Sequence, residues 1–156
     1  MSGIWRNLLT LLLAVFSRDE SILKTGCFCT FLVTPFDVGV STLKSDKYWQ
    51  FAESAQLDFG ARSGLMRRMR QAGCSMVNVT QNIQFDSPVK LFDKVTVQTN
   101  IVFVDAKHIY FQHVYSVKGN ACATAIVKGK FKAGRMTQSA LELTGLTFSA
   151  KPSFLI

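Results

Sequence analysis

Four runs of alternating apolar and polar residues constrain the fold of this chain more than any other feature. The runs span about residues 76–85, 94–103, 108–117 and 121–132. Between them lie the turn sequences Asp86-Ser87-Pro88, Asp105-Ala106-Lys107 and Lys118-Gly119-Asn120. Alternation places every second side chain on one face of a strand, so the pattern predicts strands, and three neighbouring strands joined by tight turns form an antiparallel meander.

The first of these runs and an earlier one carry specific predictions about faces. Val77, Val79, Ile83 and Phe85 alternate with polar residues, so we expect them to share one face. Residues 26–34 also read as a strand, with Cys27, Cys29, Phe31 and Val33 on one face. The opposite face is apolar too, which is typical of a strand buried inside a sheet.

Two helices are predicted between the early strand and the meander. Residues 45–59 carry an apolar stripe of Tyr48, Phe51, Ala52, Ala55 and Phe59. Ser45 or Asp46 is the expected N-cap, and Gly60 is the expected end. A basic second helix over about 62–72 contains Arg62, Arg67, Arg68 and Arg70. The order of elements predicts an α+β fold with the helices on one face of the sheet.

Both ends of the chain are expected to be extensions of a single domain. We expect a segment 1–24, a central domain 25–135 and a C-terminal extension 136–156 packed on that domain. Residues 4–16 have apolar residues at helical spacing, but the run is too short to span a bilayer. It predicts a helix that caps the domain or lies on a membrane surface.

Composition narrows the classes of partner. Hydrophobic residues make up 48% and charged residues 18% of the chain, which predicts a buried subunit interface or a membrane contact. Residues 61–156 contain 13 Lys and Arg against 4 Asp and Glu. Such an excess suits nucleic acid, an acidic membrane or the phosphates of coenzyme A, or is simply a soluble basic surface.

The four cysteines, Cys27, Cys29, Cys74 and Cys122, have no zinc-ligand spacing. We expect them to be reduced and no metal to be bound.

An ordered series of short motifs runs along the chain. The series is Pro35-Phe36-Asp37, the helix opening Ser45-Asp46-Lys47-Tyr48, the run Ser87-Pro88-Val89-Lys90-Leu91-Phe92-Asp93-Lys94-Val95, and the stretches 104–113 and 123–129. This series resembles the hotdog-fold acyl-CoA thioesterases, in the branch of the 4-hydroxybenzoyl-CoA thioesterase-like and thioesterase-superfamily-member-6-like proteins. It covers about residues 25–135. The resemblance implies an antiparallel sheet of five or six strands wrapped around a long central helix.

The resemblance also implies site residues. Asp37 corresponds to the acid that attacks the thioester or activates water, with helix amides holding the carbonyl oxygen; an Asx-turn is the structural alternative. The His-x-Asn-Asn element of relatives is missing, so Ser45 and Asp46 would take over part of its role, unless Asp46 is only a cap. Glu53, beside the apolar stripe, is a second catalytic carboxylate, an exposed residue or a partner of an arginine.

Substrate contacts follow from the same comparison. The acyl chain would lie along Tyr48, Phe51 and Ala52. Lys128, Lys130 and Lys132 alternate on one strand face, and with Lys107 they would hold the phosphates of coenzyme A, or else protect a sheet edge.

We therefore expect an acyl-CoA or acyl-carrier-protein thioester hydrolase. It would form a homodimer or a tetramer of dimers in the cytoplasm, with no metal or redox cofactor and no nucleic acid. A non-catalytic acyl-binding hotdog protein and, more remotely, a nucleic-acid-binding protein are the alternatives.

Overall fold

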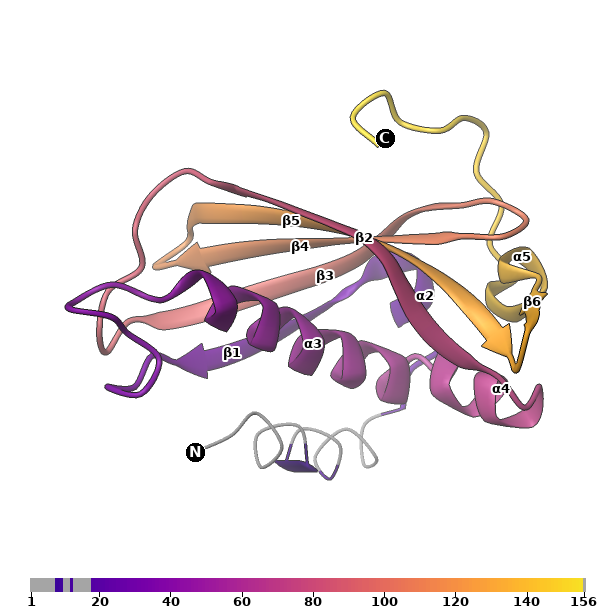
Figure 1. The fold of residues 1–156 in the computed structure, drawn as a ribbon, viewed down its shortest axis with the longest axis horizontal. Coiled ribbons are helices and arrows are strands. Elements are labelled where there is room, and N and C mark those ends of the chain that lie inside the picture. The colour runs from indigo at the N-terminus through magenta and orange to yellow at the C-terminus, as the bar shows by residue number, and fades with distance from the viewer. Residues whose placement is uncertain (1–7, 10–11, 13–17, 156) are drawn as a thin grey trace.

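A curled antiparallel sheet wraps around one long helix (Figure 1). The computed structural model describes residues 8, 9, 12 and 18–155. The strands are β1 (Cys27–Leu32), β2 (Ser75–Phe85), β3 (Lys94–Val104), β4 (Ile109–Val117), β5 (Asn120–Ala133) and β6 (Met136–Gln138). The helices are α2 (Ile22–Thr25), α3 (Ser45–Arg62), α4 (Leu65–Gln71) and α5 (Ala140–Thr144).

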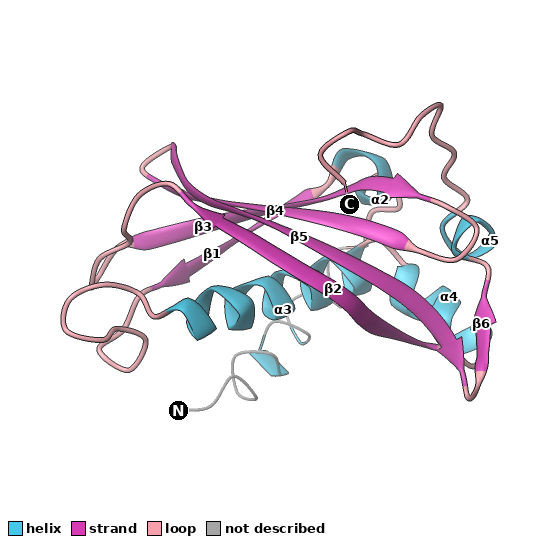
Figure 2. Cartoon of the chain, turned by 45° about the horizontal axis from the view of Figure 1, so that its top comes forward, coloured by secondary structure: helices cyan, strands magenta, loops and turns pink. Residues whose placement is uncertain are grey.

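The sheet follows the order β1-β3-β4-β5-β2, and β6 adds to β5. All pairs are antiparallel, so the predicted meander over β3, β4 and β5 is confirmed. Figure 2 shows the sheet lying across α3, with α3 against its concave face. The predicted α+β hotdog architecture is therefore the observed one.

The apolar stripe of α3 forms the centre of the core. Phe51 and Ala55 have no exposed surface, and the Phe51 ring stacks on Phe31 of β1 at 4.8 Å between centroids. Small side chains at Ala52 and Ala55 let the helix approach the sheet closely. The Tyr115 hydroxyl of β4 donates to the Tyr48 carbonyl at 2.7 Å and ties the start of the helix to the sheet.

The ends of the helices differ from the predictions. Lys44 is the N-cap of α3 and makes no side-chain capping bond, so Ser45 and Asp46 lie inside the first turn. Gly60 does not end α3, because it is buried within the helix, which continues to Arg62. The break comes at Gly64, whose backbone is left-handed with φ of 80°. The second helix is accordingly shorter than predicted, Leu65–Gln71.

The two edge strands differ most from the sequence pattern. In β1, Phe28 and Leu32 are 62% and 53% exposed, because they lie on the outer face of this edge strand, whereas its inner face is buried against the core. In β2, a bulge at Val79 breaks the alternation: Asn78 pairs with Gly129, whereas Thr80 pairs with Lys128. Val77 therefore lies on the outer face of the sheet, opposite to Ile83 and Phe85.

The C-terminal residues pack on the sheet after β6 and α5. Ser139 caps α5 by accepting a hydrogen bond from the Glu142 amide at 3.3 Å. The Phe148 ring lies 5.8 Å from that of Phe103 on β3. The prediction of a helix over 4–16 lies mostly outside the described residues; of these, Leu8, Leu9 and Leu12 are helical and about half exposed. No helix in the described part of the chain is both long and apolar enough to cross a membrane.

Candidate active site

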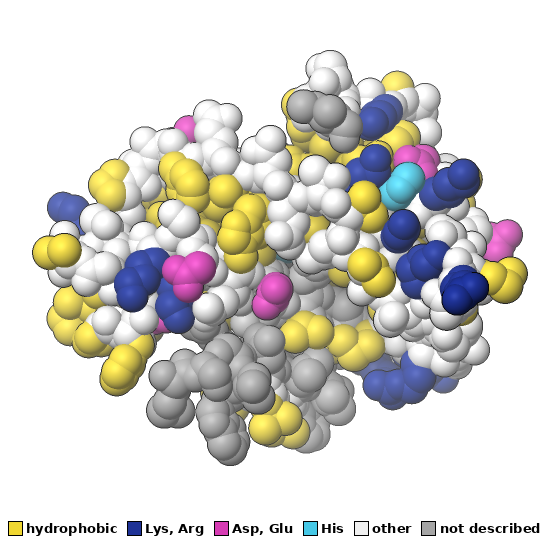
Figure 3. Space-filling view, viewed as in Figure 1, with side chains coloured by type: hydrophobic (Ala, Val, Ile, Leu, Met, Phe, Trp, Pro, Cys, Tyr) yellow, Lys and Arg dark blue, Asp and Glu magenta, His cyan; other side chains and the backbone are white. Residues whose placement is uncertain are grey.

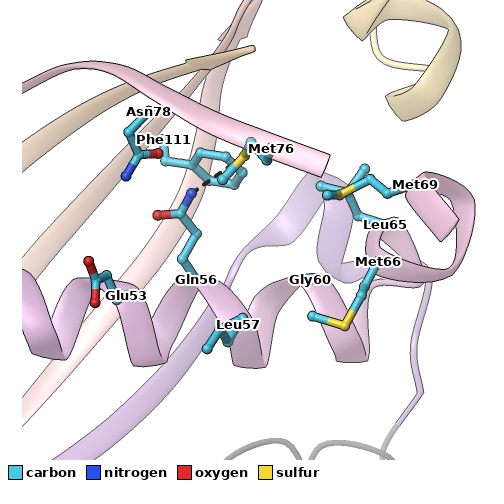
Figure 4. A pocket seen from close by; sticks show the side chains of 10 residues that line it. All are labelled: Glu53, Gln56, Leu57, Gly60, Leu65, Met66, Met69, Met76, Asn78 and Phe111. Atoms are coloured by element: carbon cyan, nitrogen blue, oxygen red, sulfur yellow. Dashed lines mark hydrogen bonds between the residues drawn. The ribbon is translucent and has the colours of Figure 1, made fainter. Parts of the chain in front are cut away.

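A cavity of about 340 Å³ lies between α3, α4 and β2, with Phe111 of β4 behind it (Figure 4). Most of its wall is apolar and rich in methionine. The lining residues are Glu53, Gln56, Leu57, Gly60, Leu65, Met66, Met69, Met76, Asn78 and Phe111. Unbranched thioether side chains adapt to different shapes, so this wall suits an apolar group of variable form.

One end of this cavity is polar. Glu53 and Gln56 are three residues apart on α3 and so share a helix face, which Figure 4 shows turned toward β2. Asn78 projects from β2 into the same space because the bulge at Val79 turns it inward. Gln56 Nε2 donates to Met76 Sδ at 3.6 Å. A carboxylate and two amides thus stand at the mouth of an apolar chamber.

Glu53 was among the residues predicted to be catalytic, and it is exposed beside the stripe of α3. Gln56 and Asn78 were not predicted. The i, i+3 relation to Glu53 is a signal that could have pointed to Gln56. Asn78 had no such signal, because regular alternation places it on the other side of β2 from Ile83.

A second cavity, also of about 340 Å³, lies at the start of α3. Two predicted binding residues, Ser45 and Tyr48, line it together with Thr42, Leu43, Phe85, Asp86, Ser87 and Pro88. Tyr48 is almost fully buried, and the desolvation of its hydroxyl raises the pKa. The first-turn amides of α3, predicted to hold an oxyanion, belong to this end of the helix.

Asp37 lies in the turn after β1 and is only 4% exposed. Its Oδ2 accepts hydrogen bonds from the Thr34 amide at 3.0 Å and the Thr34 hydroxyl at 2.7 Å. Its Oδ1 is 3.9 Å from Lys47 Nζ on α3. Neither cavity described above is lined by Asp37. The Asp37 carboxylate thus holds the turn after β1 through Thr34 and faces Lys47 of α3. Its catalytic role stays a prediction.

The other residues proposed around α3 differ in their surroundings. Asp46 is exposed in the first turn, two helical turns before Glu53. Phe51 and Ala52 face the sheet and are 0% and 2% exposed, so they belong to the core. Asp37 and Asp46 thus both lie at the start of α3 and line neither cavity, whereas Glu53 lines the first cavity two turns further along the helix.

The predicted lysine strip lies on the face of the sheet that points away from α3. Lys128, Lys130 and Lys132 alternate with the buried Val127, Gly129 and Phe131, as predicted. Lys128 Nζ lies 5.5 Å from the centre of the Tyr110 ring, while Lys132 Nζ donates to the Arg135 carbonyl at 2.6 Å. Lys107 is exposed in the β3–β4 turn. Figure 3 shows Lys and Arg gathered on the side of the molecule that holds the ends of β5 and β6.

The cysteines are free and lie away from the polar end of the cavity. Burial raises the pKa of Cys27 to about 12 and that of Cys29 to about 11, with a further contribution from Asp58. Both thiols are therefore protonated near neutral pH and poor nucleophiles. Within the described residues, no three His, Cys, Asp or Glu side chains are grouped so that they could hold a metal ion.

Known proteins share both the sequence pattern and the fold. The sequence profile of the thioesterase-like superfamily matches residues 41–133. The solved structure of YbaW, a probable thioesterase from Escherichia coli, is 20% identical with a TM-score of 0.68; the match covers 74% of this chain and 90% of YbaW.

Two further solved structures carry coenzyme A in their names. A gentisyl-coenzyme A thioesterase is 16% identical with a TM-score of 0.69, covering 77% of this chain and 100% of that one. A Staphylococcus aureus protein in complex with CoA is 17% identical with a TM-score of 0.69, covering 79% and 81%. No curated protein matches the chain.

Proposed function

Because the chain belongs to the thioesterase-like superfamily, we propose that it hydrolyses acyl-CoA thioesters to a free carboxylic acid and CoA. The observation that carries the proposal is the carboxylate of Glu53 at the polar end of a methionine-lined cavity. Solved structures of similar fold that are named for coenzyme A support the choice of carrier. An acyl group on a carrier protein is the alternative substrate.

Hydrolysis needs only an activated and oriented water molecule, because a thioester is already a good acyl donor. Glu53 takes a proton from a water molecule while the oxygen of that water attacks the carbonyl carbon of the thioester. The C–S bond then breaks, and the protonated carboxyl returns the proton to the leaving thiolate. The amides of Gln56 and Asn78 would orient the water or the carbonyl oxygen, and the acyl group would occupy the apolar part of the cavity.

A second copy of the chain would complete this site. The β2 strand is an 11-residue edge strand without a charged residue or a proline, and most of it is exposed. Such an edge offers unpaired backbone groups to another strand. Met76 and Asn78 belong to both this edge and the cavity. Pairing of two β2 strands would therefore bring the partner chain beside the candidate site, as expected for a homodimer.

Matched variants of two carboxylates test the proposal. Glu53→Gln should lower kcat/KM for acyl-CoA by about 10²–10⁴, the usual loss of a general base, with the melting temperature unchanged because Glu53 is exposed. Thiol release across short, long and aromatic acyl-CoAs is the measurement. Tight binding of acyl-CoA without thiol release by the wild type would favour the non-catalytic alternative.

Asp37→Asn is the companion variant. If Asp37 activates water, turnover falls while the melting temperature holds. If it serves to close the turn, the neutral amide accepts more weakly from Thr34 and no longer attracts Lys47, so stability falls by about 1–3 kcal/mol and the melting temperature drops. A full loss of turnover in stable Asp37→Asn, together with an active Glu53→Gln, would move the catalytic role to Asp37.

A further inference from the structure

A smaller cavity, of about 180 Å³, lies at the corner between α3 and α4 and is lined mostly by arginine. Its residues are Arg18, Glu20, Arg62, Gly64, Arg67, Arg68 and Gln71. Four guanidinium groups face one carboxylate in this lining. Three of the four arginines predicted for the second helix, Arg62, Arg67 and Arg68, thus lie at one place, and the hydrolysis proposed above makes no use of them.

Two of the four arginines are partly occupied by structural contacts. Arg62 Nη1 is 3.1 Å from Asp58 Oδ2. Arg68 Nη1 donates to the carbonyls of Leu143 and Thr144 at 3.2 and 3.0 Å and so caps the C-terminal end of α5. Arg68 Nη2 lies 3.8 Å from Glu20 Oε2. These contacts fix the guanidinium groups of Arg62 and Arg68 at the cavity.

The remaining donors have no partner among the described residues. Arg62 Nε is buried and makes no hydrogen bond there. No ion pair joins Arg18 or Arg67 to an acidic residue of the described chain. A buried donor of a charged group without an acceptor is costly, so this place favours an anion that could accept from it.

The backbone keeps the cavity open. Gly64 lines it with a left-handed backbone, φ of 80°, and a Cβ built there would meet only Glu20 Oε1, at 3.9 Å. The Asp19 amide donates to the Arg62 carbonyl at 3.0 Å, so the segment that carries Arg18 is held against the end of α3. The arginines therefore come from two segments that are tied together.

We propose that this cavity binds a phosphate group carrying at least two negative charges, such as a phosphomonoester or a pyrophosphate. Guanidinium forks match the oxygen geometry of phosphate, and several of them at one place favour a multiply charged group over a single carboxylate. The site lies outside both cavities at α3 described above, and its ligand need not be the hydrolysed substrate.

Titration calorimetry of the full chain with inorganic pyrophosphate tests the proposal without any acyl substrate. We expect saturable binding that Arg67→Gln or Arg18→Gln weakens about ten- to hundredfold, the loss of a charge-assisted hydrogen bond. Arg70→Gln is the matched control, because Arg70 is an exposed arginine of α4 that does not line the cavity. It should bind pyrophosphate like the wild type.

Two results would overturn the proposal. One is the absence of saturable binding by the wild type. The other is an equal loss in Arg70→Gln, which would show that binding follows surface charge alone. Unchanged melting temperatures without ligand verify that the variants fold. Competition by CoA would assign the phosphate to a soluble ester, and competition by phosphatidic acid vesicles would assign it to a lipid headgroup. Neither readout depends on hydrolysis, so failure here leaves the proposed activity standing.

Discussion

His113 is a titratable side chain that the core encloses completely. Its Nδ1 is 3.0 Å from the hydroxyl of Thr99, and its Nε2 is buried with no hydrogen-bond partner among the described residues. Burial lowers the pKa of the imidazole to about 4. A neutral ring packed beside Phe111 therefore belongs to the native state near neutral pH.

This burial makes stability depend on pH. The unfolded chain binds a proton on His113 near pH 6.5, whereas the folded chain resists it down to about pH 4. Stability is thus full above pH 6.5 and falls as the pH drops, by at most about 3 kcal/mol. Urea unfolding at pH 7 and 4.5 measures the fall, which should shrink in His113→Gln. His108→Gln, a change at a half-buried histidine, should show the same fall in stability as the wild type. An equal fall in wild type and His113→Gln would contradict the assignment.

Edge strands carry unpaired backbone groups, so they are the places where this sheet can pair with a strand of another chain. The β1 and β2 strands both end the sheet, but only β2 contributes to the candidate site. A two-fold axis across paired β2 strands would bring the central Thr80 of each copy close together. The prediction of a dimer can therefore be tested at one residue.

Thr80→Lys should dissociate the dimer by placing like charges across the axis. Thr30→Lys makes the same change at an exposed threonine of β1 and should leave the dimer intact. Sedimentation equilibrium gives the mass, and thiol release gives the activity, which should fall with dissociation. Dissociation by Thr30→Lys alone would move the interface to β1, and a fully active monomer would remove the need for a partner.

At the level of elements, periodicity predicted the fold well where packing is regular. The stripe of α3 and the meander from β3 to β5 were readable because every second or every third to fourth residue meets the core. Two short elements, β6 and α5, were not predicted, since three and five residues are too few for a period to show. The residues of the candidate site were harder to predict than the fold. Glu53 stood out as a charge beside an apolar stripe, but Asn78 depends on a bulge that local sequence does not specify.

The whole molecule separates its chemistry between the two faces of the sheet. The concave face carries α3 and the apolar cavity, and the convex face carries the lysine strip beside Tyr110. Lys151 from the C-terminal segment also lies over this ring, at 5.3 Å. A long substrate with an apolar end and a phosphorylated end would have to pass an edge of the sheet to reach both faces.

Replacing Lys128 and Lys130 with Gln tests whether that happens. If these lysines hold the phosphates, KM for acyl-CoA should rise about two- to tenfold with kcat nearly unchanged, the mark of lost uniform binding. The rise should diminish at high salt, and an acyl-pantetheine without the nucleotide should not respond. Gln at the exposed Lys94 and Lys118, near the other end of the sheet, is the control. An equal loss with acyl-pantetheine would mean that the lysines act through folding.

The bulge in β2 has a consequence for how the chain tolerates a change in length. Losing a residue inside a strand normally turns every side chain on one side of the gap to the opposite face. Val79 is the unpaired residue of the bulge, so its removal would join Asn78 to Thr80 in plain alternation, with Asn78 still inward and Thr80 still outward. A one-residue deletion there would straighten the strand yet preserve the lining of the cavity.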